Sequence, residues 1–484
     1  MRCYSKNAGK KDRGIQDVNG KLVRGVLCVL IGLGIWFAPM PEGVKVQAWH
    51  LLAVFVATIA AFILQPVAIG SAAVIGLATV VFTGVLKPGQ ALEGFSATVI
   101  WLIVAAFMFS KGFIKTGLGR RIAFVLMERF GSSTLKLAYT LSFTDLIISP
   151  FTPSNTARGG GIIYPITRSL CTAFGSEPGP SRRKVGAYLM FSAYSAVIIS
   201  ASIFMTAASN NVVAVKLTQD LFGTTITWMD WFLATSLPGA ICTVLFPYLI
   251  YKLYPPEVKE TPEAKTLARE ELQRMGPMSA AEKILTVIFS ISLVLWATTS
   301  ITNFDSAFIA IAGLSAMLVT KVLDWQDVLE EKGAWDVLIW MGVLVNMAAY
   351  LAKFGLMTWF ATAVGAQMAG IEWLTMLIVL FLIYNYVHYG FASNTAHVMA
   401  LFGAFATVAV AAGAPVLLTC ILLGVFANTC SMLTHFACGV TPIFFGAGYI
   451  TMGEFWKIGF VLATAHIVIW LGVGMPWMKV LGMW

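Results

Sequence analysis

FTPSNTARGGGIIYPI, residues 151–166, decides the fold of this 484-residue chain, together with FASNTAH, residues 391–397. Each stretch places the tripeptide Ser-Asn-Thr inside a long apolar run, where unpaired polar groups are costly. Both tripeptides continue with Ala and then a basic or titratable residue, Arg158 in the first copy and His397 in the second. The repeated pattern, SNTAR and SNTAH, predicts two matched polar points buried in a membrane.

The composition is that of a membrane protein that crosses the bilayer several times. Hydrophobic residues make up 58% of the chain and charged residues 11%, whereas soluble domains carry roughly a quarter charged residues. Apolar stretches close to the ~20 residues that a spanning helix needs fill most of the length, which leaves no room for a soluble catalytic domain. We expect spans near residues 24–39, 48–68, 71–87, 97–115, 186–214, 229–251, 284–301, 335–352, 415–433 and 457–475.

The net charge of +9 is concentrated outside these stretches. Lys and Arg mark cytoplasmic loops, so we expect a basic cytoplasmic tail at residues 1–23 and a cytoplasmic linker at residues 252–283 that contains a short surface helix. The basic charge therefore indicates membrane topology, and no nucleic-acid partner is expected. The seven cysteines show no metal-type pairing and are expected to pack as small residues.

An internal repeat relates the two halves of the chain. Val99-Ile100-Trp101 resembles Leu338-Ile339-Trp340 at an offset of 239 residues, and the two SNT motifs keep the same offset. The charge assignment makes the halves antiparallel, as in the inverted repeats of many transporters. We therefore predict an all-α fold of two inverted repeats, residues 24–251 and residues 284–484.

Each SNT motif is expected at the tip of a re-entrant helical hairpin. The first hairpin covers about residues 135–175, where Pro150, Pro153 and the glycine run 159–161 interrupt the helix. The second covers about residues 373–412. Irregular backbone at membrane depth is tolerated only where protein buries it or where it lines a cavity, so the two tips are expected to meet near the midplane.

The tips have the chemistry of an anion site. A helix that begins at each tip offers unpaired N–H groups and the positive end of its dipole, and the hydroxyl and amide side chains donate further hydrogen bonds. Arg158 and His397 would add positive charge. The plainer alternative is an ordinary helix N-cap. The expected ligands of a dicarboxylate are Ser154, Asn155, Thr156, Ser393, Asn394 and Thr395.

Each half contains a second polar break. Residues 206–211 (TAASNN) interrupt one apolar run, and Thr434-His435 interrupts another. We expect unwound segments that face the tips, with Thr434 on the substrate and with Asn210 and His435 compensating charge. Close helix packing through small residues is the alternative. Asp145 and His388 also lie in apolar runs; for Asp145 we favour pairing with a nearby base over proton coupling.

These motifs resemble the divalent anion/sodium symporter family. The resemblance rests on FTPSNTARGGGIIYPI (151–166), IKTGLGRRIA (114–123), FASNTAH (391–397) and LTHFACGVTPIFFGAGY (433–449), and it is strongest to the exchanger branch of citrate/succinate, tartrate/succinate and 2-oxoglutarate/malate antiporters. It implies a homodimer whose protomers each have a scaffold domain and a transport domain that moves like an elevator. It also implies that the SNT motifs bind the substrate carboxylates.

The expected function is exchange of di- or tricarboxylates across a bacterial inner membrane, with no cofactor. The first break lacks the Thr-Pro type of sequence found in Na⁺-using relatives, which argues against Na⁺; Na⁺-coupled dicarboxylate symport is the alternative. A membrane-embedded metal hydrolase is disfavoured because the five histidines form no HExxH motif, and no metal ligand is predicted. A channel with paired re-entrant tips is a further alternative.

Overall fold

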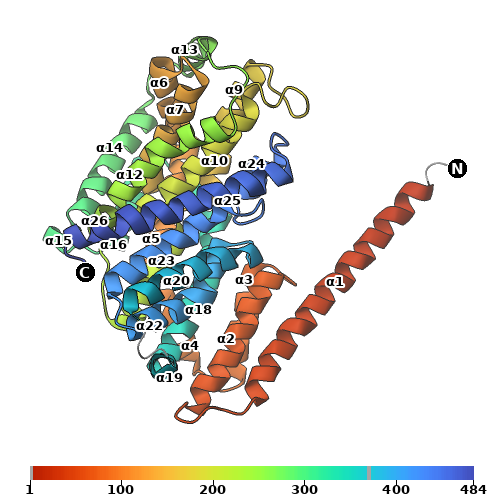
Figure 1. Ribbon diagram of the computed structural model, residues 1–484, viewed down its shortest axis with the longest axis vertical. Coiled ribbons are helices and arrows are strands. Elements are labelled where there is room, and N and C mark those ends of the chain that lie inside the picture. The colour runs from red at the N-terminus through yellow and green to blue at the C-terminus, as the bar shows by residue number, and fades with distance from the viewer. Residues whose placement is uncertain (1–3, 368–371) are drawn as a thin grey trace. The chain divides into compact units, whose positions relative to one another are not determined.

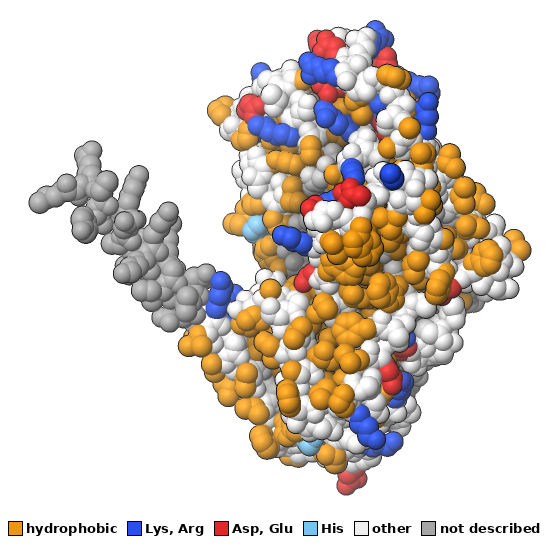
Figure 2. Space-filling model, turned by 180° about the vertical axis from the view of Figure 1, so that it is seen from behind, with side chains coloured by type: hydrophobic (Ala, Val, Ile, Leu, Met, Phe, Trp, Pro, Cys, Tyr) orange, Lys and Arg blue, Asp and Glu red, His pale blue; other side chains and the backbone are white. Residues whose placement is uncertain are grey.

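The computed structural model describes the backbone of residues 4–367 and 372–484, so residues 1–3 of the expected tail lie outside the described residues. Within this part the chain is all α-helical and contains no strand (Figure 1). Ten helical segments among the described residues are long and apolar enough to cross a membrane. Figure 2 shows one face of the molecule, on which hydrophobic side chains form broad patches and many charged side chains gather toward the ends.

The chain divides into two compact units. The first comprises described residues within 4–100 and 336–367, and the second comprises those within 101–335 and 372–484. Each unit takes residues from both halves of the sequence repeat. The helices of the first unit are α1 (Tyr4–Phe37), α2 (Val46–Leu64), α3 (Ile69–Phe82), α4 (Pro88–Leu92), η1 (Glu93–Ser96), most of α18 (Lys332–Lys353) and α19 (Leu356–Gln367).

The second unit contains both hairpins and both polar breaks. Its helices from the first half and the linker are α5 (Thr98–Thr116), α6 (Leu118–Phe130), α7 (Thr134–Ile148), η2 (Ser149–Phe151), α8 (Asn155–Arg158), η3 (Gly159–Ile163), α9 (Tyr164–Ala173), α10 (Gly186–Ile203), η4 (Met205–Ala207), α11 (Ser209–Phe222), α12 (Trp228–Leu253) and α13 (Glu263–Met275). The later helices are α14 (Ala280–Ala297), α15 (Thr299–Thr302), α16 (Ser306–Val319), α17 (Trp325–Glu330), α20 (Trp373–Tyr386), η5 (Val387–Gly390), α21 (Asn394–His397), η6 (Val398–Phe402), α22 (Gly403–Ala411), α23 (Val416–Thr429), η7 (Cys430–Met432), α24 (Thr441–Gly446), α25 (Met452–Ile469), η8 (Trp470–Gly474) and α26 (Met475–Val480).

Helix α10 is the buried centre of the second unit. All of its residues are buried, and it packs against α7, α9, α12 and α23. Its sequence, GAYLMFSAYSAVIISASI, is apolar or small on every side, which is typical of a helix that is covered all round. The linker contains the expected surface helix, α13, which packs against α6 (Figure 1).

The structure repeats itself at the offset found in the sequence. Helix α8 begins at Asn155 and α21 begins at Asn394, 239 residues later. A π-helical turn follows each of them, η3 in the first hairpin and η6 in the second, at the same offset. The two tips therefore have the same local structure, as duplicated sequences would give.

One expectation from sequence was wrong in detail. The glycine run 159–161 does not end a helix, because it forms the start of the π-helical turn η3 and continues into α9. The missing side chains instead allow close packing: a Cβ on Gly159 would lie 2.6 Å from Val440 Cγ2. Helix α16 lies outside the expected spans, and its 14 residues are shorter than a typical spanning helix.

Candidate functional site

The first hairpin turns at Ser154. Helix α7 ends at Ile148, and η2 and three further residues, 152–154, follow before α8 begins. Ser154 is the N-cap of α8, and its Oγ accepts a hydrogen bond from Ala157 N at 3.2 Å. Pro150 and Pro153 flank the turn; proline lacks the N–H that an uninterrupted helix would require.

The second hairpin turns in the same way at Ser393. Its Oγ accepts a hydrogen bond from Ala396 N at 3.3 Å, and α21 begins at the next residue. The N-cap interpretation of the SNT motif is therefore correct for both serines. The N-cap role is compatible with anion binding, because the first backbone N–H groups of a helix lack intrahelical partners and lie at the tip.

The six predicted ligands lie at the two tips, with different exposure. Thr156 is exposed, Asn394 is buried, and Ser154, Asn155, Ser393 and Thr395 are half-buried. The amide oxygen of each asparagine accepts from the protein: Asn155 Oδ1 from Arg158 Nη2 at 3.4 Å, and Asn394 Oδ1 from Ser431 Oγ at 2.8 Å. Neither amide Nδ2 donates to another described residue, so both nitrogens remain available as donors.

Each polar break packs against the hairpin of its own half. In the first half, Ser209 N donates to Pro153 O at 3.0 Å, and the Thr206 hydroxyl donates to Pro150 O. In the second half, Ser431 contacts Asn394 as described above, and the His388 ring bonds to Ala437 O. The unwound segments thus lie beside the tips.

The two hairpins also meet the same segment of chain, residues 431–440. A Cβ on Gly439 would lie 2.5 Å from Thr156 Oγ1, so the first tip approaches this glycine closely. The second tip contacts the segment through Ser431 and Asn394. Helix α11, which follows the first break, packs against α21 of the second tip. Both SNT tips are therefore joined through one short unwound segment.

Arg158 does not stand free as a positive charge beside the first tip. Its Nε donates to Asp145 Oδ1 at 2.9 Å, and both side chains are fully buried. The remaining donors reach Thr152 O at 2.8 Å, Ala207 O at 3.0 Å and Val197 O at 3.1 Å. The expected contribution of Arg158 to charge compensation is corrected accordingly, because Asp145 neutralises the guanidinium.

His397, the counterpart of Arg158, has a different environment. It is fully buried, and its Nδ1 lies 3.1 Å from Nδ1 of His388, which is also buried. The Tyr384 ring meets His397 edge to face at 4.2 Å. No acidic side chain among the described residues forms an ion pair with either histidine.

Asn210 belongs to an amide network that connects the first break to α23. Its Nδ2 donates to Asn428 Oδ1 at 3.1 Å, and Asn428 Nδ2 donates to Asn211 Oδ1 at 2.7 Å. All three side chains are buried. Sequence reasoning missed Asn428, although a lone amide in the apolar stretch 415–433 was a signal that could have found it.

The two residues of the second break lie in unlike surroundings. Thr434 is fully buried, and its Oγ1 has no hydrogen-bond partner among the described residues. His435 is only half-buried, and its Nδ1 accepts from Trp456 Nε1 at 3.0 Å. His435, which was expected to compensate charge, is therefore a partly exposed residue paired with Trp456. Among the described residues, no three His, Cys, Asp or Glu side chains gather as a metal site requires.

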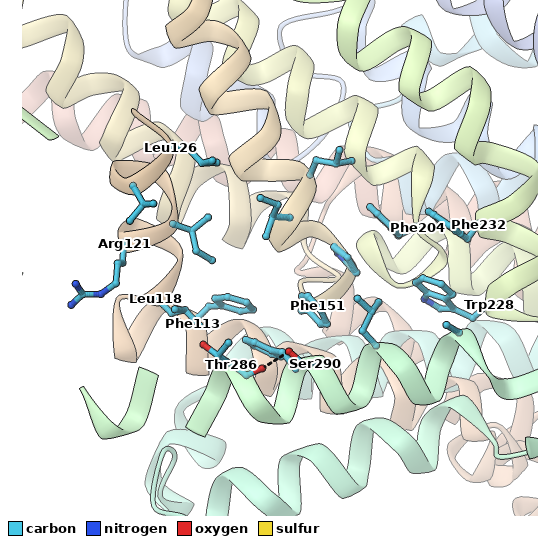
Figure 3. Close-up of a pocket in the computed structure, with 18 of the residues that line it drawn as sticks. Phe113, Leu118, Arg121, Leu126, Phe151, Phe204, Trp228, Phe232, Thr286 and Ser290 are labelled. Atoms are coloured by element: carbon cyan, nitrogen blue, oxygen red, sulfur yellow. Dashed lines mark hydrogen bonds between the residues drawn. The ribbon is translucent and has the colours of Figure 1, made fainter. Parts of the chain in front are cut away.

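A large cavity flanks the end of α7 and η2, just before the first tip, and its lining does not include the SNT residues. It has a volume of about 800 Å³, and its lining includes Phe113, Phe151, Trp228 and Phe289. Figure 3 shows Phe113, Phe151 and Trp228 around the space, with the Arg121 guanidinium turned away at one edge. Arg121 is already paired with Glu282 at 2.6 Å. The apolar lining does not suit a dicarboxylate, so the cavity is not the proposed substrate site.

Comparison with known proteins adds evidence from whole-chain similarity. The family described as "Sodium:sulfate symporter transmembrane region" matches residues 19–484. The chain is 46% identical to the "Putative malate transporter YflS" of Bacillus subtilis, over 99% of this chain and 100% of that protein. It is 42% identical to "Dicarboxylate transporter 1, chloroplastic" of Spinacia oleracea, over 97% of this chain and 83% of that protein.

A solved structure supports the fold independently. MtrF of Neisseria gonorrhoeae superposes with a TM-score of 0.57 at 12% identity, covering 95% of this chain and 94% of that one. The ten apolar helices found within the described residues and these relatives make the chain an integral membrane protein and a transporter rather than an enzyme. The chain belongs to the sodium:sulfate symporter family, which is the divalent anion/sodium symporter family that its SNT motifs resemble.

Proposed function

We propose that this protein carries di- or tricarboxylates across a bacterial inner membrane and binds them between its two SNT tips. The observation that carries the proposal is the matched pair of helix starts that contact one segment, residues 431–440. Each tip offers backbone N–H groups and an amide Nδ2, so a molecule with two carboxylates can place one at each tip.

The names of the relatives agree with this substrate class. YflS is named a putative malate transporter, and the spinach protein is named a dicarboxylate transporter. Candidate substrates are malate, succinate, 2-oxoglutarate, tartrate and citrate. Thr434 is a candidate ligand, because its buried hydroxyl lacks a partner among the described residues.

The proposed mode is exchange of one carboxylate for another by a homodimer with an elevator movement. When the site is empty, a buried charge without a counter-ion opposes the return of the empty carrier across the membrane. Arg158 contributes little to such a charge because Asp145 pairs with it, and His397 is left as the residue that can supply it. The alternative is Na⁺-coupled symport, which the name of the family favours.

Counterflow in proteoliposomes tests the mode of transport. Purified protein is reconstituted with internal malate, and uptake of labelled succinate is followed with and without Na⁺. Exchange predicts saturable uptake that requires an internal carboxylate and does not require Na⁺. Na⁺-dependent uptake into vesicles without internal substrate would establish the symport alternative, and uptake that does not saturate would indicate a channel.

A further inference from the structure

The two hairpins carry different titratable side chains beside their tips, with different partners. In the first, a permanent cation, Arg158, is balanced by Asp145, so this pair offers a bound dianion no net charge. In the second, the equivalent position holds His397, which has no acidic partner among the described residues. A buried dianion requires compensation. Of the two equivalent positions, Arg158 and His397, only the His397 imidazole can therefore change its charge.

The hydrogen bonds assign the protons of the two histidines. His388 Nε2 lies 3.0 Å from Ala437 O, and a carbonyl oxygen only accepts, so Nε2 carries a proton. In neutral His388 the Nδ1 then has a lone pair. His397 Nδ1, 3.1 Å away, must donate to it. The second ring nitrogen, His397 Nε2, is left as a buried lone pair with no partner among the described residues.

The geometry points to His388 and His397 as a proton-binding site that takes up one proton when a dicarboxylate binds. His397 Nε2 accepts a proton that the acid form of the buffer releases through the solvent, and the charge of the pair rises by one while the substrate remains a dianion. Neither existing hydrogen bond has to break. His388 acts as a positioning residue, because it directs the free lone pair of His397 to Nε2.

The groups around His397 determine what can balance the added positive charge. The rings that face His397 are those of His388, Tyr384 and Phe391. On α11, Lys216 and Asp220 form an ion pair with each other. The other titratable groups on adjoining elements are Tyr386, Tyr389, Cys420 and Cys430, and the segment 431–440 adds His435, whose Nδ1 accepts from Trp456 Nε1, and Cys438. Among the described residues around it, an imidazolium here has no unpaired carboxylate to balance it, so a bound dicarboxylate is the natural counter-ion.

This inference rests on the proposed function and deepens it, since the proton would accompany each carboxylate in both directions of exchange. Calorimetric titration of the full-length protein with succinate, in buffers of different ionisation enthalpy, measures the protons taken up on binding. At about pH 7 and about pH 8.5, both above the ~6.5 at which an unperturbed histidine titrates, we expect up to one proton per succinate. We also expect affinity to fall up to tenfold per pH unit as protons become scarce.

Variants separate the proton site from a purely structural role. His397→Gln should bind succinate at least tenfold more weakly and take up no proton. His388→Gln should retain proton uptake, because its amide can donate to Ala437 O and accept from His397, whereas His388→Leu should shift the pH profile. His50→Gln is the matched control, since His50 stacks on Trp36 in the other unit, and it should behave as the unmodified protein.

The outcomes distinguish this inference from the proposed function. Tight succinate binding without proton uptake at either pH, in the unmodified protein, would overturn the proton site alone. Because this measurement uses the unmodified protein, it tests the proton site even if the His397 variant does not fold. Failure of succinate, malate and 2-oxoglutarate all to bind would contradict the proposed function itself. Net uptake driven only by a pH gradient would support the proton site and contradict obligate exchange.

Discussion

Arg158 Nε donates a hydrogen bond to Asp145 Oδ1 across 2.9 Å, and neither side chain is exposed. The bond ties the SNT tip to the helix that enters the hairpin, because Asp145 lies in α7. Through Ala207 O the same guanidinium holds the first polar break. One ion pair therefore fixes three segments of the site relative to one another.

Removal of one partner of this pair should destabilise the protein strongly. Arg158→Met or Asp145→Leu leaves a buried charge without a counter-ion, which typically costs about 3–5 kcal/mol. The loss of stability in the double variant should be smaller than the sum of the losses in the two single variants, because neither charge remains. Thermal unfolding of the three variants in detergent checks this, and strictly additive losses would show that the two side chains do not stabilise one another.

The N-caps should matter for binding as well as for stability. Ser154→Ala and Ser393→Ala each remove a cap worth about 1 kcal/mol, and both should weaken succinate binding because the helix start frays. Ser279→Ala is the matched control: Ser279 caps α14 in the same way, outside the hairpins. It should lower the unfolding temperature without changing succinate affinity, and equal effects of all three on affinity would refute a role of the tips.

Replacement of the neutral amide donors by carboxylates tests whether the site binds an anion. In Asn155→Asp and Asn394→Asp the available Nδ2 donor becomes a carboxylate oxygen of nearly the same size. Repulsion of a dianion should weaken binding about tenfold or more, which is about 1.4 kcal/mol. Asn303→Asp, in an exposed loop, is the control for added charge. Binding measured by calorimetry that stays unchanged in both tip variants would place the substrate elsewhere.

Gly159 should be required for the packing of the first hairpin. An alanine Cβ would lie 2.6 Å from Val440 Cγ2 and 3.3 Å from Val197, and such overpacking costs about 1–3 kcal/mol. Because Val440 belongs to the segment shared by both tips, transport should fall with stability. At Gly446 a Cβ meets nothing within 4 Å, so Gly446→Ala should preserve both. Unfolding temperature and counterflow rate are the readouts; a stable, active Gly159→Ala protein would contradict the close approach.

The tips were predictable because their chemistry is local. An N-cap serine, flanking prolines and a polar motif in an apolar run act within a few residues, so sequence shows where each hairpin turns. The 239-residue offset likewise needs only comparison of the two halves. The spans followed from hydropathy, and the 14 residues of α16 fall short of the length expected for a crossing.

By itself, the sequence determined that this is a membrane protein with two matched polar tips, since composition, periodicity and capping are properties of neighbouring residues. Only the tertiary structure decided that Asp145 cancels Arg158, that His388 sets the proton of His397, and that Gly439 admits Thr156. These relationships depend on how broken helices fold back on one another. The free energy of a charge or a lone pair is set by the atoms around it, and those atoms come together only in the folded chain.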